Sequence, residues 1–192
     1  MILQSIRYNL ASLFRLSGRD SRAQFWPYAL GIFFLCVVVD VLLMIPVMFD
    51  MIEKLQAYVM AHPEGLPPPV PGQPPLPPEL MPDFGSMMVP MTLVSVAAIL
   101  LWAGAVVRRL HDRDRSGWWG AIVLPFQLFG AVVAPRAMKA MMAVGPSGKP
   151  SSLVLASTLN SLLFWGAAIV LIVLLAGPGT LGPNRFGEPP PA

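Results

Sequence analysis

Four long apolar runs constrain this 192-residue chain more than any other feature of its sequence. A helix needs about 20 apolar residues to cross a bilayer core of about 30 Å. The runs cover residues 25–49, 87–107, 118–134 and 153–176. Only 12% of the residues are charged, against about 25% in an average soluble domain, which is too few to coat a soluble globule. The sequence therefore predicts an all-α membrane protein with four transmembrane helices, organised as one integral membrane domain over residues 1–192.

The third run is the shortest of the four. It contains Pro125 and Gln127, and a proline inside a helix removes a backbone hydrogen bond. We therefore expect this span to be kinked or partly re-entrant.

The basic residues indicate how the spans are oriented, because cytoplasmic loops carry an excess of Lys and Arg. Nine of the thirteen lie on one side of the predicted bilayer, namely Arg7, Arg15, Arg19, Arg22, Arg108, Arg109, Arg113, Arg115 and Arg185. The other side has Lys54, Arg136, Lys139 and Lys149. Both termini are therefore expected in the cytoplasm, with an even number of spans. The net charge of +3 then reflects orientation, and we expect no nucleic-acid partner.

The segment before the first span is expected to be helical. Within residues 2–16, apolar side chains recur at helical spacing and would form one face of a helix. They are Leu3, Ile6, Leu10, Leu13 and Phe14. This pattern predicts an amphipathic helix lying in the membrane interface, ended by Gly18. Ser21 and Gln24 have the spacing of a capping box, so the first span should begin directly after Ser21.

Prolines mark the segment between the first two spans. Residues 63–82 hold ten of them, which predicts an extended, polyproline-like external linker. It serves either as a spacer or as a docking site for an external partner. Helical spacing of apolar residues from 51 to 59 also predicts that the first helix continues outside the membrane. Residues 135–145 are expected to form a short amphipathic turn on the outer surface. Residues 177–192 are expected to form a cytoplasmic tail.

The densest polar segment is residues 108–119, in the loop between the second and third spans. Its arginines can simply hold this loop at anionic headgroups, and its two tryptophans suit an interfacial aromatic belt. Headgroup contact and an aromatic belt do not explain why His111 and Asp112 stand next to each other among four arginines. The pairing suggests a salt-bridge network or an anion site.

Three motifs occur in order along the chain. They are Gly-Arg-x-Ser-Arg-x-x-Phe-Trp from residue 18, Arg-Arg-Leu-His-Asp from 108 with Ser-Gly-Trp-Trp from 116, and Gly-Pro-Asn-Arg-Phe-Gly from 182. Together they resemble the YhaH/YhaI-like family of bacterial inner-membrane proteins, a domain of unknown function, over roughly residues 10–190. The resemblance implies a small multi-helix membrane protein without an established activity, so it carries over no catalytic residue. The long proline-rich stretch departs from the family pattern.

All three motifs fall on the predicted cytoplasmic side, where they would form a folded cap on the helical bundle. Its candidate residues are Arg19, Ser21, Arg22, Trp26, Arg108, Arg109, His111, Asp112, Ser116, Trp118 and Asn184. Within this cap, Asp112 is expected to hold His111 or to bind Arg19 or Arg22. Asn184 is expected to bridge backbone groups.

Two polar residues lie inside the spans. Asp40 is in the first run and Asn160 in the fourth, and an isolated charge at bilayer depth costs about 2.5–3.5 kcal/mol on insertion scales. Asp40 therefore either takes part in proton or ion passage, lies near the outer interface, or is protonated and bonded to Thr158 or Asn160.

The function expected from these observations is that of an accessory or scaffold protein. Its partners would be the lipid bilayer with its anionic headgroups, and another membrane protein or a second copy of the chain. The alternatives are an oligomeric transporter or channel for a small solute, and an enzyme acting on lipid headgroups with His111 as its base. One cysteine and two histidines are too few for a structural zinc site, and no cofactor, metal or catalytic residue is predicted.

Overall fold

The computed structural model describes residues 2–66, 77, 80–81, 84–144 and 151–190. Its elements are α1 (Ile2–Ala11), α2 (Arg22–Ala61), α3 (Phe84–Asp112), the 3₁₀ helix η2 (Gly117–Val123), α4 (Leu124–Val144) and α5 (Ser152–Ala176). The described part of the chain is thus helical apart from its connections and a C-terminal tail.

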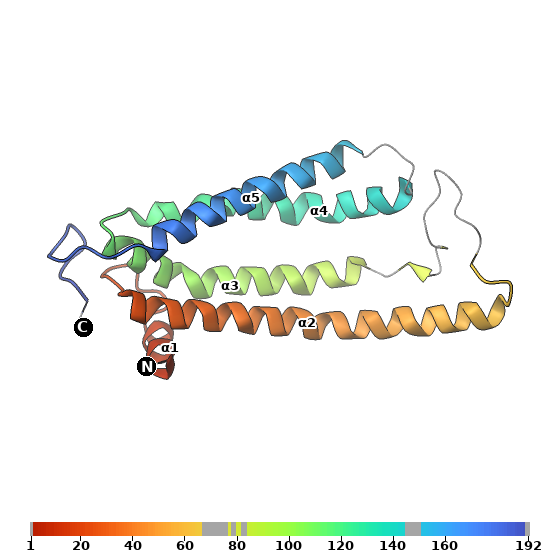
Figure 1. Cartoon of the computed structure of the whole chain (residues 1–192), viewed down its shortest axis with the longest axis horizontal. Helices are drawn as coiled ribbons and strands as arrows, with labels where there is room; N and C mark the ends of the chain where they lie inside the picture. The colour runs from red at the N-terminus through yellow and green to blue at the C-terminus, as the bar shows by residue number, and fades with distance from the viewer. Residues whose placement is uncertain (1, 67–76, 78–79, 82–83, 145–150, 191–192) are drawn as a thin grey trace.

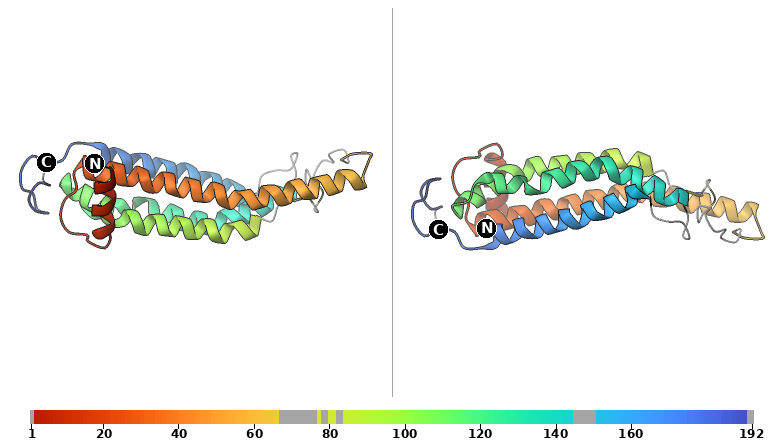
Figure 2. Two further views of the ribbon diagram at one scale, coloured as in Figure 1. Left: turned by 90° about the horizontal axis from the view of Figure 1, so that it is seen from below. Right: turned by 90° about the horizontal axis from the view of Figure 1, so that it is seen from above.

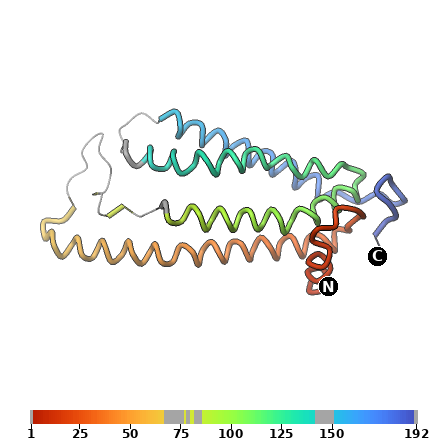
Figure 3. The backbone as a smooth tube through the Cα atoms, turned by 180° about the vertical axis from the view of Figure 1, so that it is seen from behind, coloured from red at the N-terminus to blue at the C-terminus, as the bar shows by residue number. Residues whose placement is uncertain are grey.

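The long helices form two antiparallel pairs. Helix α2 packs on α3, and α4 packs on α5, so the pairs appear as two separate layers in Figure 1. The pairs are joined at one end, where η2 contacts α3, α4 and α5. Helix α1 and the C-terminal tail lie at this same end (Figure 3). We call this region, formed by α1, residues 12–21, 108–123 and 177–190, the cap.

The buried core also lies toward the cap. It joins α2, α3 and α5 through Phe25, Tyr28, Ile32, Ala105, Leu110 and Leu175. The Tyr28 hydroxyl donates to the carbonyl of Leu101 at 2.8 Å, and the Trp102 indole donates to the carbonyl of Ala29 at 3.3 Å. These bonds fix the height of α2 against α3 directly beneath the cap.

Four helices are long and apolar enough to cross a membrane, as the apolar runs predict. They are Arg22–Ala61, Ser86–Asp112, Gly117–Met141 and Ser152–Ala176. Most of their large apolar side chains face outward rather than into the protein, which suits a lipid environment. The chain is a multi-pass helical membrane protein.

Helix α2 begins as predicted and extends far beyond the predicted span. The Ser21 hydroxyl accepts from the Gln24 backbone at 3.3 Å, and the Gln24 side chain accepts from the Ser21 backbone at 2.8 Å. The helix then continues for 40 residues to Ala61, about 60 Å at 1.5 Å per residue. Figure 2 shows its last turns projecting past the other helices, so the predicted continuation beyond residue 49 is confirmed.

The third apolar run is divided into two helix types. Residues 117–123 are 3₁₀-helical and α4 follows from Leu124. Pro125 lies in the first turn of α4, where a helix has no intrahelical acceptor for the proline's missing N–H. The expected end at residue 134 is wrong, as is the turn expected at 135–145: α4 continues through Pro135 to Val144.

Helix α1 is shorter than expected and turns a polar face to the protein. It ends at Ala11 rather than at Gly18, because carbonyl groups of the following segment bind a buried arginine of α3 instead of continuing the helix. Ser5 and Asn9 are buried, whereas Leu3 and Leu10 are exposed. Most of the proline-rich stretch 63–82 lies outside the described residues.

Candidate functional site

The last turns of α3 direct three charged side chains, those of Arg108, Arg109 and Asp112, into the cap. Arg108 and Arg109 are both 0% exposed, and Asp112, one turn on from Arg108 and Arg109, is 3% exposed. Successive helical residues differ by about 100° in direction, so neighbouring arginines reach different parts of the chain. A third buried arginine, Arg19, enters from the loop before α2.

Arg108 binds α1 and the segment that follows it. Its Nε donates to Asp20 Oδ2 at 2.9 Å, and its Nη2 donates to Asn9 Oδ1 at 2.8 Å. Its Nη1 donates to the carbonyls of Ser12 and Arg15 at 2.7 and 2.6 Å. Four of the five N–H groups of this guanidinium therefore bind one carboxylate, one amide and two main-chain acceptors.

Asp20 is a buried acid that the sequence interpretation did not identify. Its Oδ1 accepts from the Tyr8 hydroxyl at 2.9 Å, and its backbone N–H donates to the Arg108 carbonyl at 3.2 Å. Burial raises the pKa of Asp20, while Arg108 and Tyr8 oppose that rise. Burial also raises the pKa of Tyr8, and Asp20 raises it further. An acid between two arginines, immediately before a span, was the signal available in the sequence.

Asp112 joins the other two buried arginines. Its Oδ1 accepts from Arg19 Nη2 at 3.0 Å and Nε at 3.2 Å, and its Oδ2 accepts from Arg109 Nη1 at 2.5 Å. Of the partners expected for Asp112, the structure selects Arg19. The bonds to His111 and Arg22 do not form, since both carboxylate oxygens face the two guanidinium groups.

The remaining donors of these arginines hold the C-terminal tail. Arg109 donates to the carbonyls of Leu175 at 2.9 Å and Gly177 at 2.5 Å, which otherwise lack partners at the end of α5. Arg19 donates to the carbonyls of Thr180 at 2.7 Å and Gly182 at 2.8 Å. Three segments distant in sequence therefore meet on two guanidinium groups.

The third motif forms a turn that packs on the second. Asn184 and Gly187 form an antiparallel bridge, with Gly187 at φ 120°, a conformation that favours glycine. Asn184 donates to the His111 carbonyl at 2.9 Å and accepts from the Phe186 backbone at 2.9 Å. Asn184 thus bridges backbone groups, as expected. Beside it, Arg185 pairs with Asp114 at 3.1 Å on the exposed surface.

His111 is placed differently from its neighbours. Its ring stacks on Phe186 with centroids 3.8 Å apart, and its Nδ1 is shielded from solvent without a hydrogen-bond partner in the described part of the chain. It also borders a groove of about 580 Å³ between α3 and η2. A hydrogen bond with the Gly18 backbone and the stacking on Phe186 hold the imidazole in place as a polar group at the wall of this groove.

We call this hollow the α3–η2 groove. Its lining residues are Leu16, Ile99, Trp102, Ala103, Val106, Val107, His111, Ser116, Gly117, Trp118, Gly120, Ala121, Val123, Leu124 and Leu171. Ser116 caps η2 by accepting from the Trp118 backbone at 3.5 Å. The Trp118 side chain is 84% exposed, so it lies at the edge of the groove rather than inside the protein.

Four other arginines, in the cap or directly after its residue 21, have no acidic partner among the described residues. Arg7, Arg15, Arg22 and Arg115 are exposed, and none forms an ion pair within the described residues. Trp26, by contrast, is half-buried and packs edge-to-face on Phe25 at 5.2 Å, which assigns it to the core beneath the cap. The cap thus has ion-paired arginines in its interior and unpaired arginines on its surface.

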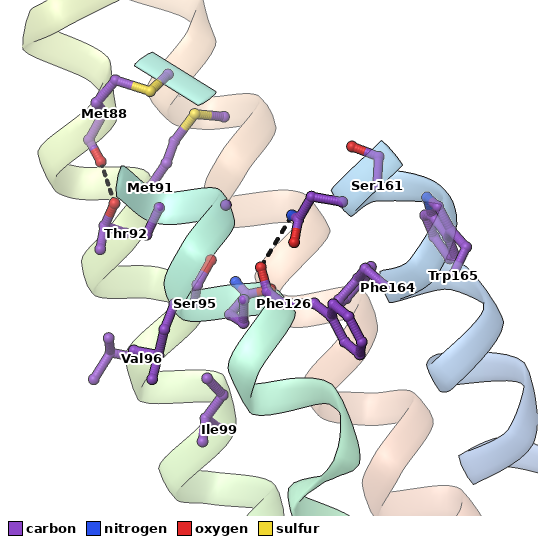
Figure 4. Close-up of a pocket in the computed structure, with 15 residues that line it drawn as sticks. Met88, Met91, Thr92, Ser95, Val96, Ile99, Phe126, Ser161, Phe164 and Trp165 are labelled. Atoms are coloured by element: carbon purple, nitrogen blue, oxygen red, sulfur yellow. Dashed lines mark hydrogen bonds between the residues drawn. The ribbon is translucent and has the colours of Figure 1, made fainter. Parts of the chain in front are cut away.

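A second hollow of about 330 Å³ lies among α3, α4 and α5 (Figure 4). Its polar lining residues are Thr92, Ser95, Gln127, Asn160 and Ser161. The Asn160 amide donates to the Phe126 carbonyl at 3.1 Å, which links α5 to the first turn of α4. Gln127, expected at a kink, instead lines this polar hollow.

Asp40 does not reach the residues proposed as its partners. Thr158 donates to the Val154 carbonyl within α5, and Asn160 to Phe126, because α5 pairs with α4 while Asp40 lies on α2, which pairs with α3. The expected bond to Thr158 or Asn160 is therefore wrong. Its Oδ1 is shielded and has no partner among the described residues.

Comparison with known proteins places the three motifs in one family. The family described as a protein of unknown function, DUF805, matches residues 13–188. The chain belongs to the DUF805 family. The match runs from the loop before Arg19 to the turn at Gly187, and so includes all three buried arginines of this DUF805 protein. No curated protein and no solved structure matches the chain.

Proposed function

We propose that this DUF805 protein is an accessory or scaffold protein of a bacterial inner membrane, with both termini in the cytoplasm. Its cap would contact anionic lipid headgroups and neighbouring membrane proteins. One observation carries the proposal: three arginines are buried in ion pairs with Asp20 and Asp112, while four others at the same end are exposed without an acid.

The buried set gives the cap a defined shape. Arg19, Arg108 and Arg109 donate to two carboxylates and to main-chain carbonyls of three segments. Buried charges are tolerated when they are paired and hydrogen-bonded in this way. These donors are occupied, so their role is to hold the cap together rather than to bind a ligand.

The exposed set supplies the contact with the membrane surface. An arginine near an anionic bilayer contributes about 1 kcal/mol, and four of them lie on this end of the molecule. Helix α1 lies crosswise to α2 (Figures 1 and 2), with Leu3 and Leu10 exposed near Arg7. An amphipathic helix lying in the cytoplasmic interface has this composition.

Cysteine labelling tests the orientation. The sole native cysteine, Cys36, is first replaced by serine, and single cysteines are then introduced as Ser17→Cys in the cap and Glu64→Cys beyond α2. In intact spheroplasts an impermeant maleimide should label the Glu64→Cys protein, and the Ser17→Cys protein only after lysis. The reverse pattern would overturn the orientation.

Lipid dependence tests the function of the exposed arginines. The thermal midpoint is measured in nanodiscs of phosphatidylglycerol and of phosphatidylcholine, for the wild type and for a variant with Arg7, Arg15, Arg22 and Arg115 changed to Gln. The wild type should be more stable in the anionic lipid, and the variant should lose most of that difference. A triple variant with Lys54, Arg136 and Lys139 changed to Gln is the control from the opposite end. An equal loss in both variants would refute a role specific to the cap.

The polar hollow supports a second candidate, an oligomeric small-solute transporter. Polar side chains at bilayer depth commonly line substrate pathways, and Gln127 and Ser95 face this hollow from two helices. Asp40 is not among its lining residues. Subunit counting by native mass spectrometry and water permeation past Asp40 would distinguish the two functions: a dry monomer counts against transport.

The groove beside His111 supports the third candidate, an enzyme acting on lipid headgroups. The imidazole of His111 forms no hydrogen bond with Asp112, whose carboxylate binds Arg19 and Arg109. Ser116 lines the same groove. Headgroup release from labelled phosphatidylglycerol by the wild type, absent in His111→Ala, would favour this candidate over the accessory function.

A further inference from the structure

We propose that the α3–η2 groove binds one anionic phospholipid of the surrounding cytoplasmic leaflet. An acyl chain would lie along the apolar wall of the groove, and the phosphate would lie at the end formed by His111 and Ser116. This inference rests on the membrane orientation proposed above and adds a discrete site to the general surface attraction.

The groove has the dimensions of a ligand site. Its volume of about 580 Å³ falls within the range of about 300–1,000 Å³ that is usual for small-molecule sites. On α3 its lining extends from Ile99 to His111, a rise of about 18 Å for twelve residues at 1.5 Å each. The hollow is therefore elongated along the helix axis, as an extended hydrocarbon chain requires.

Polarity is confined to one end of this length. Ile99, Trp102, Val106 and Leu171 supply apolar wall, whereas His111 lies at the cap end of α3. Ser116 is the residue immediately before η2. A ligand that matches both parts has a long apolar tail and a polar head.

Charge at the polar end favours an anionic head. Arg115 directly precedes Ser116, is exposed, and has no ion pair within the described residues. Arg15 directly precedes another lining residue, Leu16. The imidazole of His111 and the hydroxyl of Ser116 line this end of the groove, so a phosphodiester there would meet polar groups and supply a counter-charge to Arg115.

Two glycines keep η2 close to α3. A Cβ added at Gly117 would lie 2.8 Å from Val107 Cγ1, and one added at Gly120 would lie 2.8 Å from Val106 Cγ1. Both distances are too short for real contacts, so the wall formed by η2 depends on glycine. The exposed Trp118 at the edge has the amphipathic ring that is enriched at headgroup level.

Retained lipid can be counted by native mass spectrometry after purification from mixed phosphatidylglycerol and phosphatidylcholine nanodiscs. Ala103 is exposed and lines the groove, and Ala97 is exposed on the same helix outside it. Ala103→Phe therefore fills the groove, while Ala97→Phe is the matched control. Arg115→Gln removes the charge beside the polar end, and Arg136→Gln removes an exposed charge at the opposite end of the bundle.

The wild type should retain one phosphatidylglycerol per chain, and retention should fall at least tenfold in Ala103→Phe but not in Ala97→Phe. Arg115→Gln should lower the preference for phosphatidylglycerol over phosphatidylcholine at least threefold, with Arg136→Gln unchanged. Equal retention in the two phenylalanine variants would overturn the groove site, and equal effects of the two arginine variants would overturn the headgroup assignment. Neither result would affect the nanodisc test of the four exposed arginines, so the two proposals fail separately.

Discussion

Replacing Asp112 by Asn tests whether the buried arginines depend on this one carboxylate. The side chain of Asp112 is 4% exposed, and those of Arg19 and Arg109 are 0% exposed. The substitution retains shape and one acceptor oxygen, but it turns an amide NH₂ toward a guanidinium group. Removing one partner from a buried ion pair typically costs about 3–5 kcal/mol.

The arrangement of the remaining bonds sets the value within that range. Arg19 keeps its main-chain acceptors at Thr180 and Gly182, and Arg109 keeps those at Leu175 and Gly177. We therefore expect a loss near the lower limit, about 3 kcal/mol in the free energy of unfolding. The tail should also loosen, since Arg19, which the Asp112 carboxylate holds, donates to the carbonyls of Thr180 and Gly182.

The assay combines reversible unfolding in mixed micelles with limited trypsin digestion of the folded protein. Asp112→Asn should lower the free energy of unfolding and speed cleavage after Arg185. The control is Asp114→Asn, because Asp114 and Arg185 form an exposed pair, 49% and 60% accessible, worth about 0–1 kcal/mol. If the two variants have the same stability and the same cleavage rate, the buried network does not hold the cap together.

Two further substitutions test how the cap is attached. Gly104→Ala should destabilise the protein by about 1–3 kcal/mol, because the new Cβ would clash with the Leu13 carbonyl oxygen in the segment after α1. Gly166→Ala, with open space around it, is the control and should be neutral or slightly stabilising in the same unfolding assay. The reverse order of stability would contradict the close approach of α3 to the segment after α1. Tyr8→Phe should lose about 1–2 kcal/mol at neutral pH, since it removes a hydrogen bond to the Asp20 carboxylate. The pKa of Tyr8 is raised above 10.0 in the folded protein, so the stabilisation by its hydroxyl is complete below pH 10 and is lost as the pH rises through the higher folded pKa. The thermal midpoints of the wild type and Tyr8→Phe should therefore converge in alkali. A constant difference between them would contradict the hydrogen bond from Tyr8 to Asp20.

Much of the cap was predictable because it depends on short motifs at the ends of apolar runs. Runs that lie antiparallel bring alternate connections to the same end, so the segments containing Arg19, Asp112 and Asn184 were expected together. The capping box at Ser21 was predictable for the same kind of reason, since both of its residues lie within one turn.

The individual partners were less predictable. The sequence left three choices for Asp112, and the position of Asp20 between two arginines did not indicate that Arg108, 88 residues away, would be its partner. The apolar face expected on α1 also did not decide its packing, because Asn9 binds the buried guanidinium of Arg108 and turns a polar face inward. The hydrogen bond between Asn9 and Arg108 therefore decides which face of α1 packs on the protein, because the apolar side chains of α1 can be surrounded by lipid instead.

The apolar runs and the positions of the charges are enough to predict a helical membrane protein with four spans and with its basic residues at one end. Both properties follow from local composition, since each run must satisfy its backbone hydrogen bonds within its own helix. Packing between helices sets which arginines are buried in ion pairs, which remain exposed, and that Asp40 lies away from α5. Those outcomes depend on which helices pair and on contacts between residues about 90 positions apart, and no local pattern encodes such distances.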